Sequence, residues 1–398
     1  MGYRRFAPRI AAALAIALAA PALAQERSAD LTELPPVPTD YTPAKTAWGD
    51  WDFSATYQIE YLNAGKILFQ RPKAYGDRVW VTDEEFARRL AAAERSDAAY
   101  SPEGEDINYP GSQGLAEWMS TSAFGKRTSL LVRPRDGQLP AMTPEGQRFF
   151  ENGRSGWVPG QEYDWVTDFD TWDRCITRGF PTSMFPNRYN NGIRVWQSPG
   201  YIVIQNEMLG LRIIPIGDTP EWPGAVEQWM GHSRARWEGK TLVIETSNIK
   251  SGDAVSRDPN KRSAAPVIVT MIGGAPFNTI PMSARTRVTE RLTMTGPDTL
   301  MHELTYDDPE TFTAPWTTRI EWVRDDGYQF YEYACHEGNH AIRGYISSSR
   351  AKRRGLAEGT LQPDATDDRS RFVEIFDRDP GVALSAPPTA AAASGGGE

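Results

Sequence analysis

The chain has 398 residues, of which 40% are hydrophobic and 11% aromatic, enough to pack one large domain or two of ordinary size. Its 52 acidic side chains outnumber the 43 basic ones, and the formal net charge of −9 argues against nucleic acid or anionic lipid as a partner. The 13 tryptophans, 34 glycines and 30 prolines indicate strands and loops around bulky side chains, and argue against a helix bundle.

Residues 1–24 have the pattern of a signal peptide. Arg4, Arg5 and Arg9 precede an apolar run over 10–20, and Ala22-Leu23-Ala24 supplies the small-x-small cleavage pattern. An uncleaved membrane anchor is the alternative, which the small residues around Ala24 disfavour. No later segment reaches the roughly 20 apolar residues of a membrane span. The sequence therefore predicts a periplasmic or secreted protein without an integral membrane segment, and leaves open Sec or twin-arginine export.

Three parts are expected after the signal peptide. Residues 25–160 are predicted to form an extended arm and a mixed helical and irregular region. Within it, the capping box Thr82-x-x-Glu85 predicts a helix to about residue 95, and Thr143-Pro144 predicts a second helix start. Residues 161–355 are predicted to form a β-barrel-like domain. Residues 356–398 are a C-terminal extension whose alanine-, proline- and glycine-rich tail is expected to be disordered.

Short β-rich runs follow one another from about residue 193, separated by turn signals such as Glu238-Gly239 and Asp325-Asp326-Gly327. Strands joined so tightly must pair antiparallel, and a meander of this size generally curls into a barrel or a strongly curved sheet. We therefore predict a mainly β fold with a few helices in the N-terminal region and one helix, at about 340–353, after the last strand. The expected strands are 193–197, 200–208, 210–216, 233–237, 240–247, 265–272, 284–294, 299–307, 315–324 and 327–335.

The two cysteines, Cys175 and Cys335, are predicted to form a disulfide, because an exported chain folds in an oxidising compartment. Such a bridge stabilises a fold by about 2–4 kcal/mol. Two unpaired buried thiols are the less favoured alternative.

The stretch "HEGNH", residues 336–340, matches the H-E-x-x-H pattern of zinc peptidases. That chemistry needs both histidines on one helical face, at i and i+4. Gly338 is a poor interior helix residue, and Asn339 is a strong N-cap from which a helix would begin at His340. A strand-to-helix junction is therefore favoured over a zinc site, and no metal ligand is assigned.

Several β-runs carry acidic residues at alternating positions. In 299–308, Glu303 and Asp307 share one face of the expected strand, and Glu207 and Glu332 lie in two other runs. Such a face is usually a solvated sheet surface. If it lined the interior of a closed barrel, burial would raise the carboxyl pKa values into a range suited to proton transfer. Glu207, Glu303 and Asp307 are accordingly candidate catalytic residues, although ordinary burial preference favours the surface for any single one.

The stretch "WMGHSRARWEGKTLVIET", residues 229–246, is the strongest candidate for a site. His232 lies where a loop enters a strand and shares a face with Arg234 and Arg236, which disfavours its cationic form and suits a neutral base. Arg236 would pair with Glu207 or Glu245, or hold an anionic substrate group. The structural alternative is that His232 caps the hairpin by bonding a backbone carbonyl. The candidate substrate-binding residues are Arg236, Trp229, Trp237, Trp316, Glu332 and Asn339, with Trp322 as a further apolar wall.

These motifs, together with "RTSLLVRPRDGQLPAMTPEG", "WDRCITRGFP", "YDDPETFTAPWT" and "YEYACHEGNHAIRGYISSSR", resemble a large family of exported bacterial proteins of unassigned function. The resemblance covers most of residues 48–353. It implies a β-rich, lipocalin- or calycin-like fold and a connection with aromatic or terpenoid compounds. It also implies that tyrosine is usual at the position of His340, so that a zinc pair is not a family feature. The residues on matching motif positions are His232, Arg236, Trp237, Asp307, Glu337 and Asn339.

Three functions follow as hypotheses. The first is an exported, metal-independent hydrolase without a cofactor, which uses acid–base catalysis to cleave an ether or ester bond in a hydrophobic aromatic small molecule, such as a lignin-derived aryl ether. The second is a non-catalytic binding protein for the same class of molecule. The third and least favoured is the zinc metallopeptidase. The identity of the substrate, hydrolysis against elimination, and the oligomeric state stay open.

Overall fold

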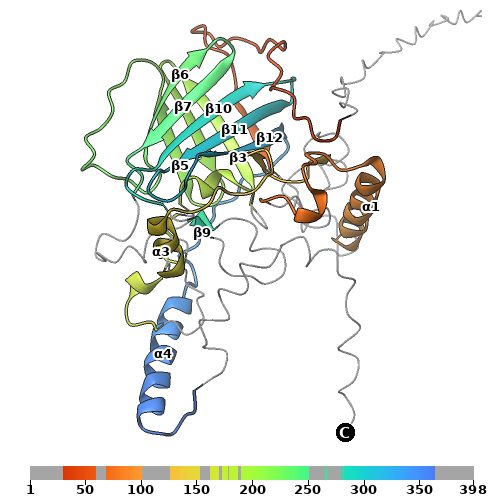
Figure 1. The fold of residues 1–398 in the computed structure, drawn as a ribbon. Helices are drawn as coiled ribbons and strands as arrows, with labels where there is room; N and C mark the ends of the chain where they lie inside the picture. The colour runs from red at the N-terminus through yellow and green to blue at the C-terminus, as the bar shows by residue number, and fades with distance from the viewer. Residues whose placement is uncertain are drawn as a thin grey trace, which may run out of the picture.

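The computed structural model describes residues 30–59, 69–100, 126–152, 162–169, 173–177, 179–186, 190–250, 265–266, 279–280 and 282–363. The expected signal peptide and the expected disordered tail lie outside these residues. Within them, nine antiparallel strands form one sheet that curls into a nearly closed barrel (Figure 1). The prediction of a mainly β fold built on an antiparallel barrel is thereby confirmed.

The barrel strands follow the order β5-β4-β3-β1-β12-β11-β10-β7-β6. The parallel bridge between Ile216 and Ala235 brings β5 and β6 together and nearly closes the ring. A tenth strand, β2, pairs with β12 at its side. The bounds are β1 Ala55–Gln58, β2 Leu131–Arg133, β3 Gly192–Ser198, β4 Tyr201–Asn206, β5 Gly210–Pro215, β6 His232–Glu238, β7 Thr241–Ser247, β10 Arg287–Met294, β11 Thr299–Asp307 and β12 Trp316–Arg324, and a separate pair joins β8 Ala265–Pro266 to β9 Thr279–Ile280.

Alternation along each strand decides which side chains fill the barrel. On β11, Leu300, His302 and Leu304 are buried, whereas Glu303 is half-buried and Asp307 is exposed. The inward side chains of all nine strands join one hydrophobic core. Its largest members are Trp316 and Trp322, both fully buried on β12.

The barrel sheet contains strands from both before and after residue 160. β1 lies between β3 and β12, and β2 pairs with the other end of β12, so two strands from the predicted N-terminal region belong to the barrel sheet. The first β-strand therefore comes from the aromatic stretch that precedes the expected meander.

The predicted strand over 327–335 is wrong. Asp325 accepts the backbone N–H of Gly327 through its side chain, which ends β12 in a turn. β12 is already paired with β11 on one edge and with β1 and β2 on the other. The following segment therefore finds no free edge on β12 to join, and Tyr328 packs over Gly192 at the start of β3.

Three α-helices accompany the barrel in the part of the chain that the structure describes, α1 Asp83–Tyr100, α3 Pro144–Asn152 and α4 Ala341–Ala357. The capping box before α1 is confirmed, because Thr82 and Glu85 exchange backbone and side-chain hydrogen bonds of 2.7 and 3.2 Å. At α4 the prediction was one residue early, since the N-cap is His340. None of these described helices combines the length and the apolar character needed to cross a membrane.

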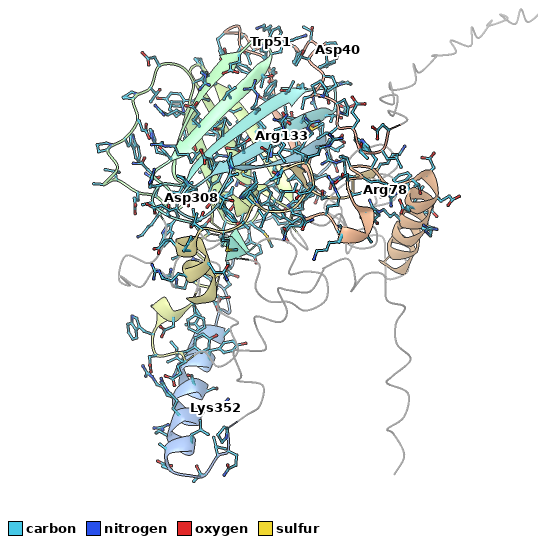
Figure 2. All side chains as sticks on the ribbon, viewed as in Figure 1. Asp40, Trp51, Arg78, Arg133, Asp308 and Lys352 are labelled. Atoms are coloured by element: carbon cyan, nitrogen blue, oxygen red, sulfur yellow. A yellow bond between two sulfur atoms is a disulfide. The ribbon has the colours of Figure 1, made fainter. Side chains whose placement is uncertain are left out.

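We call the end of the barrel that carries the β4–β5 turn and Asp308 the lower end. Figure 2 shows Trp51 toward the opposite end and Lys352 far below, on α4. α4 packs on residues 162–169 through Tyr345, which contacts Tyr163 and Phe169.

The predicted disulfide is confirmed: Cys175 and Cys335 are bonded across 160 residues of sequence. The bridge ties the segment before β3 to the junction between β12 and α4. Two segments that belong to no strand are thereby fixed against each other at the lower end.

Candidate functional site

A pocket of about 690 Å³ opens at the lower end of the barrel. Four stretches of chain form it: the end of β4 with its turn into β5, the loop before β6, the residues after Cys175, and the residues before Cys335. Lys250, three residues after the end of β7, also contributes to the lining. Its lining is Ile176, Thr177, Gln205, Asn206, Glu207, Leu209, Gly210, Leu211, Glu227, Gln228, Trp229, Met230, Lys250, Tyr331, Glu332 and Tyr333.

The loop before β6 is held by backbone hydrogen bonds to the end of β7. The N–H of Gln228 donates to Asn248 at 3.0 Å, and Lys250 donates back to Gln228 at 2.7 Å. The side chain of Asn248 also donates to the carbonyls of Pro223 and Val226. This anchoring fixes Trp229 on the pocket wall.

Trp229 is half-buried, and its ring carries a cation on its face. The ammonium of Lys250 lies 4.5 Å from the ring centroid, and the guanidinium of Arg174 lies 5.9 Å from it. Tyr331 and Tyr333 supply two further aromatic side chains to the lining. The pocket thus combines aromatic surface with charge, as small-molecule sites commonly do.

Glu207 is buried where the pocket meets the barrel. Its carboxylate accepts hydrogen bonds from the Tyr328 hydroxyl at 2.5 Å, from Asn190 Nδ2 at 2.9 Å and from the N–H of Gly192 at 3.2 Å. A Cβ at position 192 would lie within 3.1 Å of this carboxylate and closer still to Tyr328, so glycine is required there. These three hydrogen bonds hold the Glu207 carboxylate in one place, so that it positions the chain around it.

Three of the sequence-predicted site residues therefore meet at one pocket: Glu207, Trp229 and Glu332. Asn339 lies nearby and supports a wall, since its Nδ2 donates to the carbonyl of Asp173 at 2.9 Å and lies 3.3 Å from Cys175 Sγ. The remaining candidates lie elsewhere.

Glu303 and Asp307 lie on the outer face of β11. Glu303 is held by the guanidinium of Arg319 at 2.8 Å, and Asp307 is exposed opposite Arg287 of β10. The structure does not bring these two carboxylates together with Glu207. Asp307 is exposed to solvent, as burial preference favours, and Glu303 is half-buried against Arg319.

His232 and Arg236 lie on the outer face of β6, at the edge of a network of ion pairs. Arg236 pairs with Glu238 and with Glu245, the second of its two expected partners, at 2.9 and 2.8 Å. His232 is only 6% exposed and stacks on Trp222 at 4.2 Å. The network continues through Arg234–Glu221, Arg287–Glu221 and Arg291–Glu238.

The environment of His232 predicts a pH dependence of stability. Burial lowers the pKa of the imidazole, and the nearby Arg234 lowers it further against a smaller opposing effect of Glu221. Because the charged form is disfavoured in the fold, this contribution is complete above the unfolded pKa of about 6.5 and is lost as the pH falls below it. Urea denaturation at about pH 7.5 and about pH 5 measures the free energy of unfolding at each pH. From the higher to the lower pH, this free energy should fall more in the wild type than in His232→Phe, which keeps the stack on Trp222. Equal losses in the two proteins would contradict this role of His232.

The other predicted tryptophans fill the barrel. Trp316 stacks on Tyr306 at 4.8 Å, Trp322 on His302 at 4.7 Å, and Trp237 meets Phe53 edge-on at 5.2 Å. These rings are packed against the protein's own side chains.

A buried charged cluster inside the barrel was missed by the sequence reasoning. Arg212 of β5 donates to both carboxylate oxygens of Glu290 at 3.0 and 2.5 Å, and His302 Nε2 lies 3.0 Å from the same carboxylate. Burial alone would raise the pKa of Glu290, but the charge of Arg212 and the hydrogen bond with His302 outweigh it and hold the pKa well below its ordinary value. Ser233 and Thr246 also accept from Arg212, so the cluster links β5 across the closure of the barrel to β6, β7 and β10. Its signal in sequence was a single ionisable residue on an otherwise apolar strand face, as with Glu290 between Val288 and Leu292.

The HEGNH stretch forms no common helical face. Residues 335–338 are a turn, Gly338 has a φ of 70°, and α4 begins only after His340. Among the residues that the structure describes, no three histidine, cysteine or carboxylate side chains gather as a metal site.

The pocket, with Glu207, Trp229 and Glu332 on its walls, is the candidate site on geometric grounds. Comparisons with protein-family models, with curated proteins and with solved structures found no match to this chain.

Proposed function

We propose that this chain is an exported binding protein for aromatic small molecules, with the lower-end pocket as its site. The observation that carries the proposal is the convergence of Trp229, Tyr331 and Tyr333 with polar side chains on one pocket. The disulfide supports export, because such bridges persist in oxidising compartments.

The chemistry of the lining favours a ring that carries hydroxyl or carboxyl groups. The aromatic side chains offer faces and edges to a planar ligand. Gln228 and Lys250 can donate hydrogen bonds, while Glu227 and Glu332 can accept them. A phenol presents its ring to the aromatic side chains and its hydroxyl to the hydrogen-bonding ones.

Binding without chemistry is favoured over hydrolysis by the placement of the charged groups. Acid–base cleavage needs an acid and a base within reach of one bond. His232, Glu303 and Asp307 lie on outer strand faces, and Glu207 is committed to three donors. The hydrolase stays as a second candidate because Glu227 and Glu332 both line the pocket.

Replacing Trp229 with alanine should weaken binding of a simple phenol tenfold or more, because the pocket loses its largest aromatic side chain. Isothermal titration with para-methylphenol and with guaiacol measures the affinity. Trp48→Ala is the matched control, since Trp48 is an exposed tryptophan outside the pocket lining. Equal affinity in wild type and Trp229→Ala, or no binding of any phenol by the wild type, would contradict the proposal.

The hydrolase is tested by incubating the protein with guaiacyl aryl ethers and phenyl esters and following released phenol by chromatography. The binding function predicts no release above background. Release that is lost in Glu227→Gln or Glu332→Gln, with affinity for the intact compound retained, would establish the hydrolase in its place.

A further inference from the structure

The outer face of the barrel beside the pocket is apolar. Trp196 of β3, Tyr201 of β4, and Leu211 and Ile213 of β5 are 43%, 47%, 55% and 64% exposed. Apolar side chains on an exposed face gain free energy when a ligand covers them. We call this surface, completed by Val203 and Pro215, the outer strip.

The register of the strands makes the outer strip continuous. Trp196 lies opposite Val203, and Val203 lies opposite Ile213, so one row of three apolar side chains crosses the sheet. Tyr201 lies opposite Pro215 in the next row up the barrel. Side chains directly opposite on adjacent strands have Cβ atoms about 5 Å apart, close enough to form one surface.

The outer strip runs into the pocket. Leu211 belongs to both, and Gln205, which lies opposite it on β4, also lines the pocket. The third residue of that row is Arg194, whose guanidinium lies 4.4 Å from the ring of Phe330. A polar boundary of Arg194 and Gln205 thus separates the pocket from the strip on one side, while Leu211 keeps an apolar path open on the other.

We infer that the ligand is an amphiphile with a polar aromatic head in the pocket and an apolar tail along the outer strip. This inference rests on the proposed function and specifies its ligand. From Leu211 to Pro215 the strip is about 13 Å long at the rise of an antiparallel strand. That length suits an alkyl or prenyl chain attached to a phenolic ring.

The size of the outer strip argues against a second copy of the chain as its occupant. Three strands about 4.8 Å apart and about 13 Å long present roughly 200 Å² of sheet face. A stable interface needs about 800 Å² from each partner. Across the closure of the barrel from β5, the outer faces of β6, β7 and β10 carry the ion pairs of Arg236, Glu238 and Arg291, so the apolar surface does not continue there.

Titration with phenols that differ only in tail length tests the inference. Affinity should rise about twofold for each methylene from para-methylphenol to para-pentylphenol and para-octylphenol, because each group loses about half of its contact with water on an open face. Ile213→Ser and Tyr201→Ser should flatten this rise while leaving the affinity for para-methylphenol unchanged. Leu361→Ser, an exposed leucine after α4, is the matched control and should keep the full rise.

The outcomes separate this inference from the function on which it rests. Binding of para-methylphenol with no gain from longer tails, or a gain that survives Ile213→Ser, overturns the tail site and leaves the pocket standing. Failure of every phenol to bind overturns both. Sedimentation of the wild type as a dimer that Ile213→Ser dissociates would assign the strip to a second copy and overturn the inference.

Discussion

Replacing Arg212 with alanine is expected to lower the free energy of unfolding by about 3–5 kcal/mol. Arg212 and Glu290 are both fully enclosed in the barrel, where the guanidinium is bidentate on the carboxylate. Without it, Glu290 remains as a buried charge with His302 as its nearest partner. Guanidinium-chloride unfolding of the two proteins measures the difference.

The loss of stability should come from the buried charge of Glu290 that no longer has Arg212 as a partner. Removing that charge should therefore recover stability. In Arg212→Met the stem of the side chain is retained, and adding Glu290→Gln leaves an amide that can still bond His302. We expect the double variant to regain at least half of the stability lost in Arg212→Met, because a buried pair replaced as a unit is often close to neutral. A double variant as unstable as the sum of its single variants would contradict this account.

Arg236 provides the matched control. It is an arginine on the adjacent strand β6 that also forms ion pairs, with Glu238 and Glu245, but it lies on the outer face and is half exposed. Its replacement by alanine should change the stability by about 0.5 kcal/mol or less, since exposed ion pairs contribute little. Comparing Arg212→Ala with Arg236→Ala therefore separates the effect of burial on stability from the effect of losing an ion pair.

The barrel could be predicted because each strand carries its own pattern. The runs that contain β3 to β7 and β10 to β12 alternate or are continuously apolar, and turns such as Glu238-Gly239 separate them. The run at 327–335 shows the same pattern and is not a strand. Pairing needs a free edge, and whether β12 has one depends on β1 and β2, which lie far away in sequence.

Alternation also groups side chains without deciding which group faces inward. His232, Arg234 and Arg236 were correctly placed on one face of β6, and Glu303 with Asp307 on one face of β11. The inward faces are the more apolar ones, with Ala235 on β6 and Leu304 on β11. The charged faces of β6 and β11 therefore point away from the barrel interior. The catalytic hypothesis required these charged faces to point into it.

No local sequence pattern predicts the pocket. Its walls come from the residues after Cys175, the turn after β4, the loop before β6 and the residues before Cys335. Single members could be proposed from sequence, Trp229 as an aromatic side chain for an apolar ligand and Glu332 as an acidic residue on an expected β-run. Their meeting depends on the disulfide and on backbone hydrogen bonds between the loop at Gln228 and the end of β7.

Removing the disulfide is expected to abolish most ligand binding and to leave the barrel folded. In Cys175→Ala/Cys335→Ala, the free energy of unfolding should fall by about 2–5 kcal/mol, because the bridge restricts a long loop of the unfolded chain. No barrel strand includes residues 173–177 or 327–335, so the β-sheet circular dichroism should be retained. Affinity for para-methylphenol should fall tenfold or more.

The loss of binding follows from the position of the bridge between two pocket walls. Ile176 and Thr177 follow Cys175 directly, and Tyr333 comes two residues before Cys335. Asn339→Ala removes a hydrogen bond between the same two segments, at 2.9 Å to Asp173, and should weaken binding less than removal of the covalent link does. A reductant should lower the affinity of the wild type to that of the double variant and leave the double variant unchanged. Full affinity in the double variant would mean that the walls hold together without the bridge, and the pocket would then owe its shape to the anchored loop at Trp229 alone.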